Sequence, residues 1–214
     1  MVFAAPSVLT RWRAQSIYTK EPWTLEWIAT FQPGEILLDC GANVGMYTIW
    51  AAATRKVRVY AFEPESQNYA LLNRNIQNNR LQHRVKAYCM GLSDQSGLFD
   101  LHMADMRVGG SCHAVGEALD FEHKPLQAQF VQGCVAGTLD ELVAGGAVPV
   151  PNHIKIDVDG FEPKVGLELV AQGPEGEPLP FTIRAVIGDT VTVDFNHPLA
   201  GRTLHFDVTI TEVR

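Results

Sequence analysis

Residues 35–55 read EILLDCGANVGMYTIWAAATR and decide the fold of the first part of the chain. The apolar run at 35–40 is typical of a strand buried in a parallel sheet. Residues 46–55 then have the apolar spacing of a helix. Between them, Gly41 and Gly45 let the backbone approach a ligand, and the start of the helix offers free N–H groups to its anionic parts.

The alternation of strand and helix continues outward from this stretch. It predicts a doubly wound parallel sheet of the Rossmann-like α/β class, with helices on both faces. A capping box with Thr138 as cap marks the start of an expected helix at 138–144. Residues 95–134 are irregular, with one strand possible at 97–103. The other expected strands are 57–64, 84–94 and 153–158, and the two further helices are 66–79 and 138–144.

The turn after residue 40 has an acidic partner. Glu63 follows Gly41 by 22 residues, at the end of the second strand, where a carboxylate can accept both ribose hydroxyls of a nucleoside. The turn has a GxxxG spacing and lacks the GxGxxG fingerprint of pyrophosphate binding. S-adenosylmethionine carries a ribose and no phosphate, so this pattern indicates that cofactor. The structural alternative is that the two glycines only allow a tight turn and that Glu63 is a solvated cap.

Seven stretches in order make a family resemblance specific. They are TKEPWTLEWI, LLDCGANVGMYTIWAA, VYAFEPESQNYALLNRNI, GLSD, GGSCHAVGE, TLDELV and PNHIKIDVDGFE. Along residues 10–165 the chain resembles the FkbM family of S-adenosylmethionine-dependent methyltransferases. The resemblance implies a class I methyltransferase fold that is truncated at its C-terminal end, and O-methylation of a hydroxyl on a sugar or other secondary metabolite.

The same resemblance implies roles for individual residues. The amino-acid end of the cofactor would be lined by the turn after the first strand, and Glu63 would hold the ribose. Two residues after the third strand would lie near the adenine. These residues are Asp39, Gly41, Asn43 and Gly45 for the amino-acid end, and Ser93 and Asp94 for the adenine. Asp159 stands where the family more usually has Glu.

A hydroxyl acceptor benefits from a base that takes its proton. Asp157, Asp159 and Glu162 cluster where the last strand opens toward the cleft, and His153 begins that strand. Carboxylates that lie close together in a partly apolar site raise at least one pKa, which suits a base. Structural alternatives remain for two of these candidates: Asp157 could cap the next helix or pair with Lys155, and His153 could be a structural strand-end histidine.

Other side chains favour structural interpretations. Trp12, Trp23 and Trp27 have roughly helical spacing, which predicts core positions. Cys40 is expected to be a small buried hydrophobic residue. His102, His113 and His123 could line an acceptor pocket but lack ligand spacing for a metal, so we expect no metal site.

The composition changes after residue 165. Every Trp, Cys, Met, Tyr and Lys lies before it, and the remaining residues alternate with period two around Gly188 and Asp189, which predicts an antiparallel hairpin of 180–188 and 189–196. A last strand is expected at 204–214. VDFNHPLAG and LHFDV resemble SlyD-like FKBP-type peptidyl-prolyl isomerases, in which Phe206 would match an aromatic of the proline pocket. We therefore expect a domain at 1–165 and a β segment at 166–214.

The junction has a structural consequence. A methyltransferase sheet that ends at IKIDV leaves an exposed apolar edge strand, which is an association hazard. We expect the tail to cover this edge or the chain to associate with itself through it. A recombined, engineered or misassembled gene explains such a chimera as well as a natural fusion does.

Length, composition and net charge limit the classes of partner that the chain can have. The chain has 214 residues, 46% of them hydrophobic and 19% charged, with a formal net charge of −7, which disfavours nucleic acid and anionic membranes. No stretch has the length of a membrane span, and four cysteines without CxxC pairing indicate reduced thiols in a cytoplasmic protein. The first hypothesis is a methyltransferase acting on a small molecule. The alternatives are a peptide-binding or folding helper working through the tail, and a chimera that binds cofactor without turnover.

Overall fold

The computed structural model describes residues 1–119, 124–158, 168–172, 178–187 and 190–194. The contacts divide the chain into two compact units, Met1–Glu162 and Pro163–Arg214. The predicted boundary at residue 165 stays a prediction. Asp159, Glu162 and the expected strand at 204–214 lie outside the described residues. No helix in the described ranges is long and apolar enough to cross a membrane.

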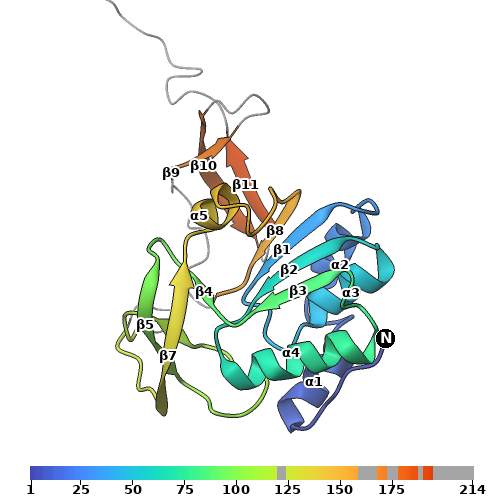
Figure 1. Cartoon of the computed structure of the whole chain (residues 1–214), viewed down its shortest axis with the longest axis vertical. Coiled ribbons are helices and arrows are strands. Elements are labelled where there is room, and N and C mark those ends of the chain that lie inside the picture. The colour runs from blue at the N-terminus through green and yellow to red at the C-terminus, as the bar shows by residue number, and fades with distance from the viewer. Residues whose placement is uncertain (120–123, 159–167, 173–177, 188–189, 195–214) are drawn as a thin grey trace, which may run out of the picture. The chain divides into compact units, whose positions relative to one another are not determined.

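A four-stranded parallel sheet forms the centre of the first unit (Figure 1). Its order is β3 (Val85–Tyr88), β2 (Arg58–Phe62), β1 (Ile36–Cys40) and β8 (His153–Ile156). Cys40 stands opposite Phe62 on one side and Ile156 on the other, so three strands end at the same level. The sheet therefore brings the chain exits after β1, β2 and β8 to one edge.

Helices cover both faces of this sheet, which confirms the predicted α/β fold class. Leu37 of β1 packs with α2 (Pro22–Ala29), α3 (Met46–Thr54) and α4 (Ser66–Asn78) on one face. Leu38 of β1 packs toward α5 (Leu139–Ala144) on the other. All five residues of β1 are buried, which explains why the strand reads as a continuous apolar run.

The region expected to be irregular forms a second sheet. Its order is β4 (Gly91–Leu92), β7 (Phe130–Gly137), β5 (Gly97–Met103) and β6 (Ala114–Val115). The strand at 97–103 is confirmed, and it pairs antiparallel with β7, which the sequence analysis missed. The buried residues of β7 are confined to its second half, at Cys134, Ala136 and Gly137, and Gln132 and Gly133 interrupt its apolar pattern, so its sequence carries a weak strand signal.

The N-terminal segment forms α1 (Val8–Ser16) and α2. The prediction that the three tryptophans before residue 30 lie in the core is wrong: Trp12, Trp23 and Trp27 are 49%, 45% and 36% exposed. The buried positions of this segment are held instead by Ile28 and by Phe31, both fully buried.

The second unit contains an antiparallel sheet in the order β11 (Thr190–Asp194), β10 (Pro178–Ile187), β9 (Glu168–Gln172). The hairpin of β10 and β11 confirms the one predicted around Gly188 and Asp189, whereas β9 was not expected. In the first unit β8 pairs only with β1 within the described residues, and Ile154 and Ile156 are 43% and 45% exposed. Self-association through this edge stays a prediction.

Candidate functional site

The turn between β1 and α3 depends on its glycines. Gly41 and Gly45 have φ values of +74° and +84°, a region that side-chain-bearing residues rarely adopt. A Cβ atom on Gly41 would stand 1.9 Å from the carbonyl oxygen of Asp157, at the exit of β8. Glycine at position 41 therefore lets the exits of two neighbouring strands touch.

Glu63 ties this turn to the end of β2. One of its carboxylate oxygens accepts a hydrogen bond from the Asn43 backbone N–H at 2.7 Å, and the other accepts one from the Glu65 N–H at 3.0 Å. The residue is 5% exposed, so the interpretation of Glu63 as a solvated cap is wrong. Burial raises the pKa of its carboxyl to about 7, even though these N–H groups favour the charged form.

Asp39 is the most deeply buried acid of the site, at 1% exposure. Its Oδ2 accepts a hydrogen bond from the Thr48 hydroxyl on α3. Its Oδ1 has no hydrogen-bond partner among the described residues. Burial raises the pKa of this carboxyl, and the positive charge of Lys155 opposes the rise. A buried acceptor without a donor is costly, so it is a sign that a ligand supplies the donor.

Lys155 and Asp157 form an ion pair at the end of β8. The Lys155 Nζ lies 2.8 Å from Asp157 Oδ2 and 5.0 Å from the centre of the Tyr47 ring. Burial by itself would raise the pKa of Asp157, but the charge and hydrogen bond of Lys155 outweigh it and lower the pKa. The expected upward shift is therefore absent at Asp157, and for Asp159 and Glu162, which lie outside the described residues, it stays a prediction. Pairing with Lys155, one of the two structural alternatives for Asp157, is what the structure shows.

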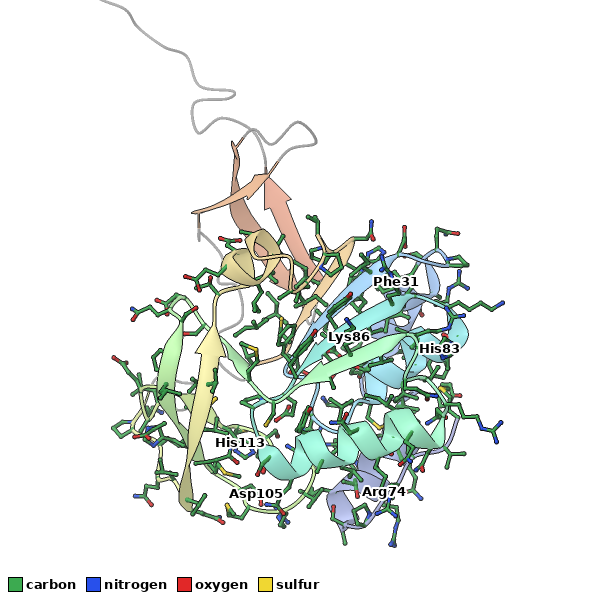
Figure 2. All side chains as sticks on the ribbon, viewed as in Figure 1. Phe31, Arg74, His83, Lys86, Asp105 and His113 are labelled. Carbon is green, nitrogen blue, oxygen red and sulfur yellow. The ribbon has the colours of Figure 1, made fainter. Side chains whose placement is uncertain are left out.

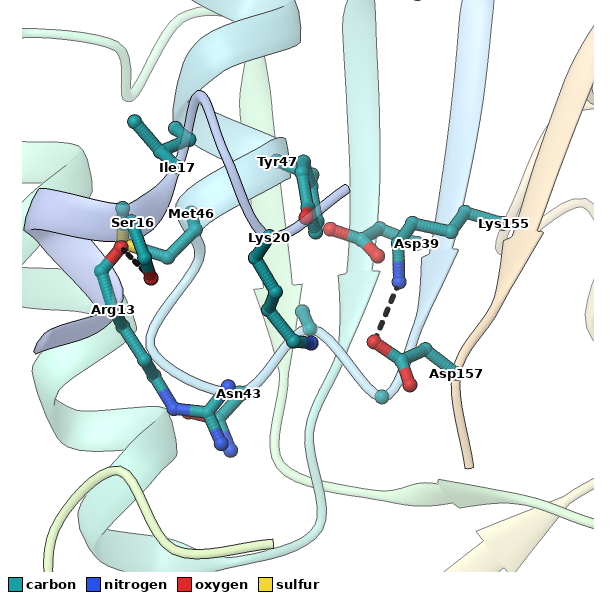
Figure 3. Close-up of a pocket in the computed structure, with 12 residues that line it drawn as sticks. Arg13, Ser16, Ile17, Lys20, Asp39, Asn43, Met46, Tyr47, Lys155 and Asp157 are labelled. Carbon is teal, nitrogen blue, oxygen red and sulfur yellow. Dashed lines mark hydrogen bonds and ion pairs between the residues drawn. The ribbon is translucent and has the colours of Figure 1, made fainter. Parts of the chain in front are cut away.

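A pocket joins these groups at the carboxyl ends of β1 and β8 (Figure 3). The N-terminal segment forms its other wall, and the cavity that remains is about 30 Å³. A water molecule occupies a similar volume in the liquid, and ligand pockets are usually ~300 Å³ or more, so the cavity in this structure is smaller than a nucleoside. The lining residues are Arg13, Ser16, Ile17, Lys20, Asp39, Gly41, Ala42, Asn43, Met46, Tyr47, Lys155 and Asp157.

Five predicted site residues that the structure describes do not line this pocket: Gly45, Glu63, His153, Ser93 and Asp94. His153 lies at the start of β8, where its ring stacks on Phe31 with centroids 3.6 Å apart and its Nε2 is 2.8 Å from Glu35 Oε2. Figure 2 shows Phe31 at the end of the sheet where the strands begin, opposite the pocket. Ser93 and Asp94 lie after β4, and the Ser93 hydroxyl donates to the Asp94 carboxylate at 3.2 Å.

The sequence analysis missed the contribution of the N-terminal segment and of a glycine turn at 109–110. The Arg13 Nε donates to the Gly109 carbonyl at 2.8 Å, and the Asn43 side-chain amide donates to the Gly110 carbonyl at 2.7 Å. Asn68 of α4 binds the same turn through the Gly109 N–H. In the sequence, the stretch GGSCHAVGE is informative only as part of a family resemblance, and α1 has no local signal that predicts a position beside the pocket.

Comparison with known proteins identifies a methyltransferase domain. Residues 24–128 match the model of the TRM5/TYW2 methyltransferase domain, just under half of the chain. The hexuronic acid methyltransferase AglP of Haloferax volcanii is 27% identical over 163 residues, which cover 76% of this chain and 62% of that protein. The methyltransferase sdnD of Sordaria araneosa is 30% identical over 129 residues, 60% of this chain and 48% of that protein.

A different similarity is to isomerases. The FKBP-type 16 kDa peptidyl-prolyl cis-trans isomerase of Escherichia coli (strain K12) is 45% identical over 75 residues, which cover 33% of this chain and 50% of that protein. Residues 166–214 make up less than 33% of the chain, so the similarity extends beyond them. The chain spans about half to three fifths of the length of these curated relatives.

The comparisons confirm two predictions about the domain. It is a methyltransferase domain, and methyltransferases of this type use S-adenosylmethionine as cofactor. The pocket fits such a cofactor chemically, because the Asp39 oxygen that has no partner among the described residues can accept from its ammonium group. In the described ranges no group of three or more His, Cys, Asp or Glu could hold a metal ion.

Proposed function

We propose that the whole chain is an S-adenosylmethionine-dependent methyltransferase that methylates a hydroxyl group of a sugar or another secondary metabolite. The observation that carries the proposal is the buried Asp39 Oδ1, which finds no donor in the described part of the chain and lies in a pocket beside the glycine turn at the carboxyl edge of a parallel sheet. Ligands of open α/β sheets bind at this edge.

The proposed cofactor contacts follow the order of the strands. Asp39 accepts from the ammonium of the amino-acid end, and Gly41, Asn43 and Gly45 shape the surface beneath it. Glu63 accepts from the ribose hydroxyls in addition to the Asn43 and Glu65 N–H groups, since a carboxylate has about four acceptor sites. Ser93 and Asp94 remain the proposed neighbours of the adenine. The bound cofactor supplies an electrophilic methyl group.

For the acceptor, proximity and alignment supply much of the rate. The proposed base comes from the acidic stretch after β8, to which Asp157, Asp159 and Glu162 belong. Asp157 is held ionised by Lys155, and a base with a lowered pKa accepts a proton weakly, so its role is to orient the hydroxyl. This leaves proton removal to Asp159 or Glu162. We do not assign this role to His153, because it sits at the opposite end of the strand.

The proposed acceptor is a small molecule. The similarity to a protein named as a hexuronic acid methyltransferase supports a sugar, and the net charge of −7 argues against a polyanionic nucleic acid. Activity should be tested against panels of sugars, uronic acids and RNA with radiolabelled cofactor. Methyl transfer to RNA alone would contradict the small-molecule assignment.

The cofactor site itself is tested by calorimetric titration of the full chain with S-adenosylmethionine. We expect binding in the wild type, and at least about tenfold weaker binding in Glu63→Gln, because the amide replaces one of the two acceptor oxygens by an NH2 group that only donates. Glu26→Ala, an exposed change on α2, is the control and should bind like the wild type. A cooperatively folded wild type that does not bind the cofactor would contradict the proposal. Binding without turnover on any acceptor would indicate a chimera that only retains the cofactor site.

The isomerase similarity favours a second candidate, a peptide-binding or folding-helper activity. A proline isomerisation assay with a tetrapeptide and a refolding assay with a proline-limited protein test it on the full chain. Rate enhancement that is unaffected by Glu63→Gln would establish this second function separately from methyl transfer. The same rates with and without the protein would exclude it.

A further inference from the structure

We propose that Arg13, assisted by Lys20, binds the α-carboxylate of the cofactor's amino-acid end, so that the pocket recognises a zwitterion with Asp39 on one side and the N-terminal segment on the other. This inference rests on the proposed function. It assigns to the N-terminal segment a binding role that lies outside the strand and turn motifs of the sheet.

The first support is position. Arg13 lies in the last turn of α1 and Lys20 in the turn before α2, and both line the same pocket as Asp39. Figure 3 shows their side chains extending from the N-terminal segment toward the turn that carries Asn43. An α-amino acid bound over this turn would meet a carboxylate at one end and cations at the other.

The second support is how Arg13 is held. Its Nε donates to the Gly109 carbonyl at 2.8 Å, the only hydrogen bond that its side chain makes within the part of the chain that the structure describes. This bond fixes the plane of the guanidinium and leaves its terminal N–H groups for another acceptor. A fixed guanidinium fork is suited to a carboxylate, because two parallel hydrogen bonds match its two oxygens.

The third support is the balance of charge around the pocket. Lys155 is already paired with Asp157, so it does not serve a ligand. Lys20 pairs with Glu21, whose side chain is only 12% exposed, so Lys20 keeps this partner and adds its charge from a distance. Arg13 has no acidic side chain as a partner within the described residues, so it is the cation that remains for an anionic group.

The test compares two ligands that differ in the amino-acid end. S-adenosylhomocysteine has the α-carboxylate and α-ammonium, whereas 5′-methylthioadenosine keeps the adenosine and sulfur and lacks both. We expect Arg13→Gln to weaken S-adenosylhomocysteine binding by about tenfold or more and to leave 5′-methylthioadenosine binding within about twofold. Lys20→Met should give a smaller loss with the same selectivity. Arg11→Gln, an exposed change two residues earlier on α1, should affect neither ligand.

Arg13→Lys guards against a folding defect, since it keeps the charge and loses the fork. It should weaken S-adenosylhomocysteine binding less than Arg13→Gln does, with the same melting temperature as the wild type. Equal weakening of both ligands, or no weakening of either, would overturn this inference while leaving the proposed function standing. A folded wild type that binds neither ligand would overturn both.

Discussion

The exits of β2 and β8 place a carboxylate at the same edge of one sheet, yet the two acids are in opposite chemical states. Glu63 after β2 is buried and accepts from two backbone N–H groups, and burial raises its pKa to about 7. Asp157 after β8 is partly exposed and paired with a lysine, which lowers its pKa. Neighbouring acids at a sheet edge are therefore distinguished by what faces them, a backbone turn or a side-chain cation.

The largest effect should come from removing the contact that joins the two exits. Gly41→Ala places a Cβ 1.9 Å from the Asp157 carbonyl oxygen and forces alanine to φ +74°. We expect a loss of more than about 3 kcal/mol in the free energy of unfolding, measured by urea denaturation, together with loss of cofactor binding.

The matched control is Gly34→Ala. Gly34 has φ +92°, but no atom lies within 4 Å of the Cβ position. It should show the backbone strain alone, about 1 kcal/mol. Equal losses in the two variants would mean that the contact between the strand exits does not shape the turn.

The next effect is a pH dependence that belongs to Glu63. Its pKa is raised from 4.5 to about 7 in the folded protein, so the folded state holds a proton that the unfolded chain releases. The stability that this proton contributes is fully present below pH ~4.5 and is lost as the pH rises through 7, by about 3 kcal/mol. Urea denaturation between these limits should show the loss in the wild type and not in Glu63→Gln. The same slope in both proteins would contradict the buried position of this acid.

The smallest effect should be a pH dependence of stability at Asp157, with a sign opposite to that at Glu63. Because its pKa is lowered, the stability that the pair contributes is present above the unfolded pKa and is lost as the pH falls through the folded value. The Asp157 side chain is 43% exposed, so Asp157→Asn should cost only about 1 kcal/mol at neutral pH. Asp94→Asn, at an exposed acid, should cost nothing measurable in the same denaturation series. If Asp157→Asn stabilises the protein at acid and at neutral pH alike, the ion pair with Lys155 is not the source of this pH dependence.

The central strands could be predicted from the sequence because both faces of the sheet are buried. Ile36–Cys40 and Arg58–Phe62 stand within two residues of the predicted ranges, and the helix at Ser66–Asn78 begins where expected. The residue before it, Glu65, is the N-cap, with its carboxylate accepting from the Gln67 and Asn68 N–H groups. Apolar runs are local signals and can be read without the fold, whereas this cap was not predicted, because Glu is not among the residues preferred at an N-cap.

The rest of the site depends on contacts between distant segments. Arg13 reaches the pocket because Gly109 fixes its guanidinium, and no local pattern near residue 13 encodes a turn almost a hundred residues away. Asp157 is a different case, because its partner Lys155 lies only two residues earlier. The sequence offers this pairing as one of several roles for Asp157, and it carries no signal that decides between them. The exposed tryptophans were mispredicted because spacing on a helix does not say which face is covered.

The order of the strands has a consequence for how the protein is made. Within the described part of the first unit, β8 is the strand that is synthesised last, and it pairs with β1, which is synthesised first. Beside this pair, the Ile36 N–H donates to the Asn152 side chain, 116 positions away in the sequence. Contacts of such separation form late, because the long intervening chain must be ordered first. During translation, β1, β2 and β3 can assemble while the chain is still growing. The wall of the pocket that carries Lys155 and Asp157 is then added last, and a nascent chain completes the proposed cofactor pocket only after residue 157 has left the ribosome.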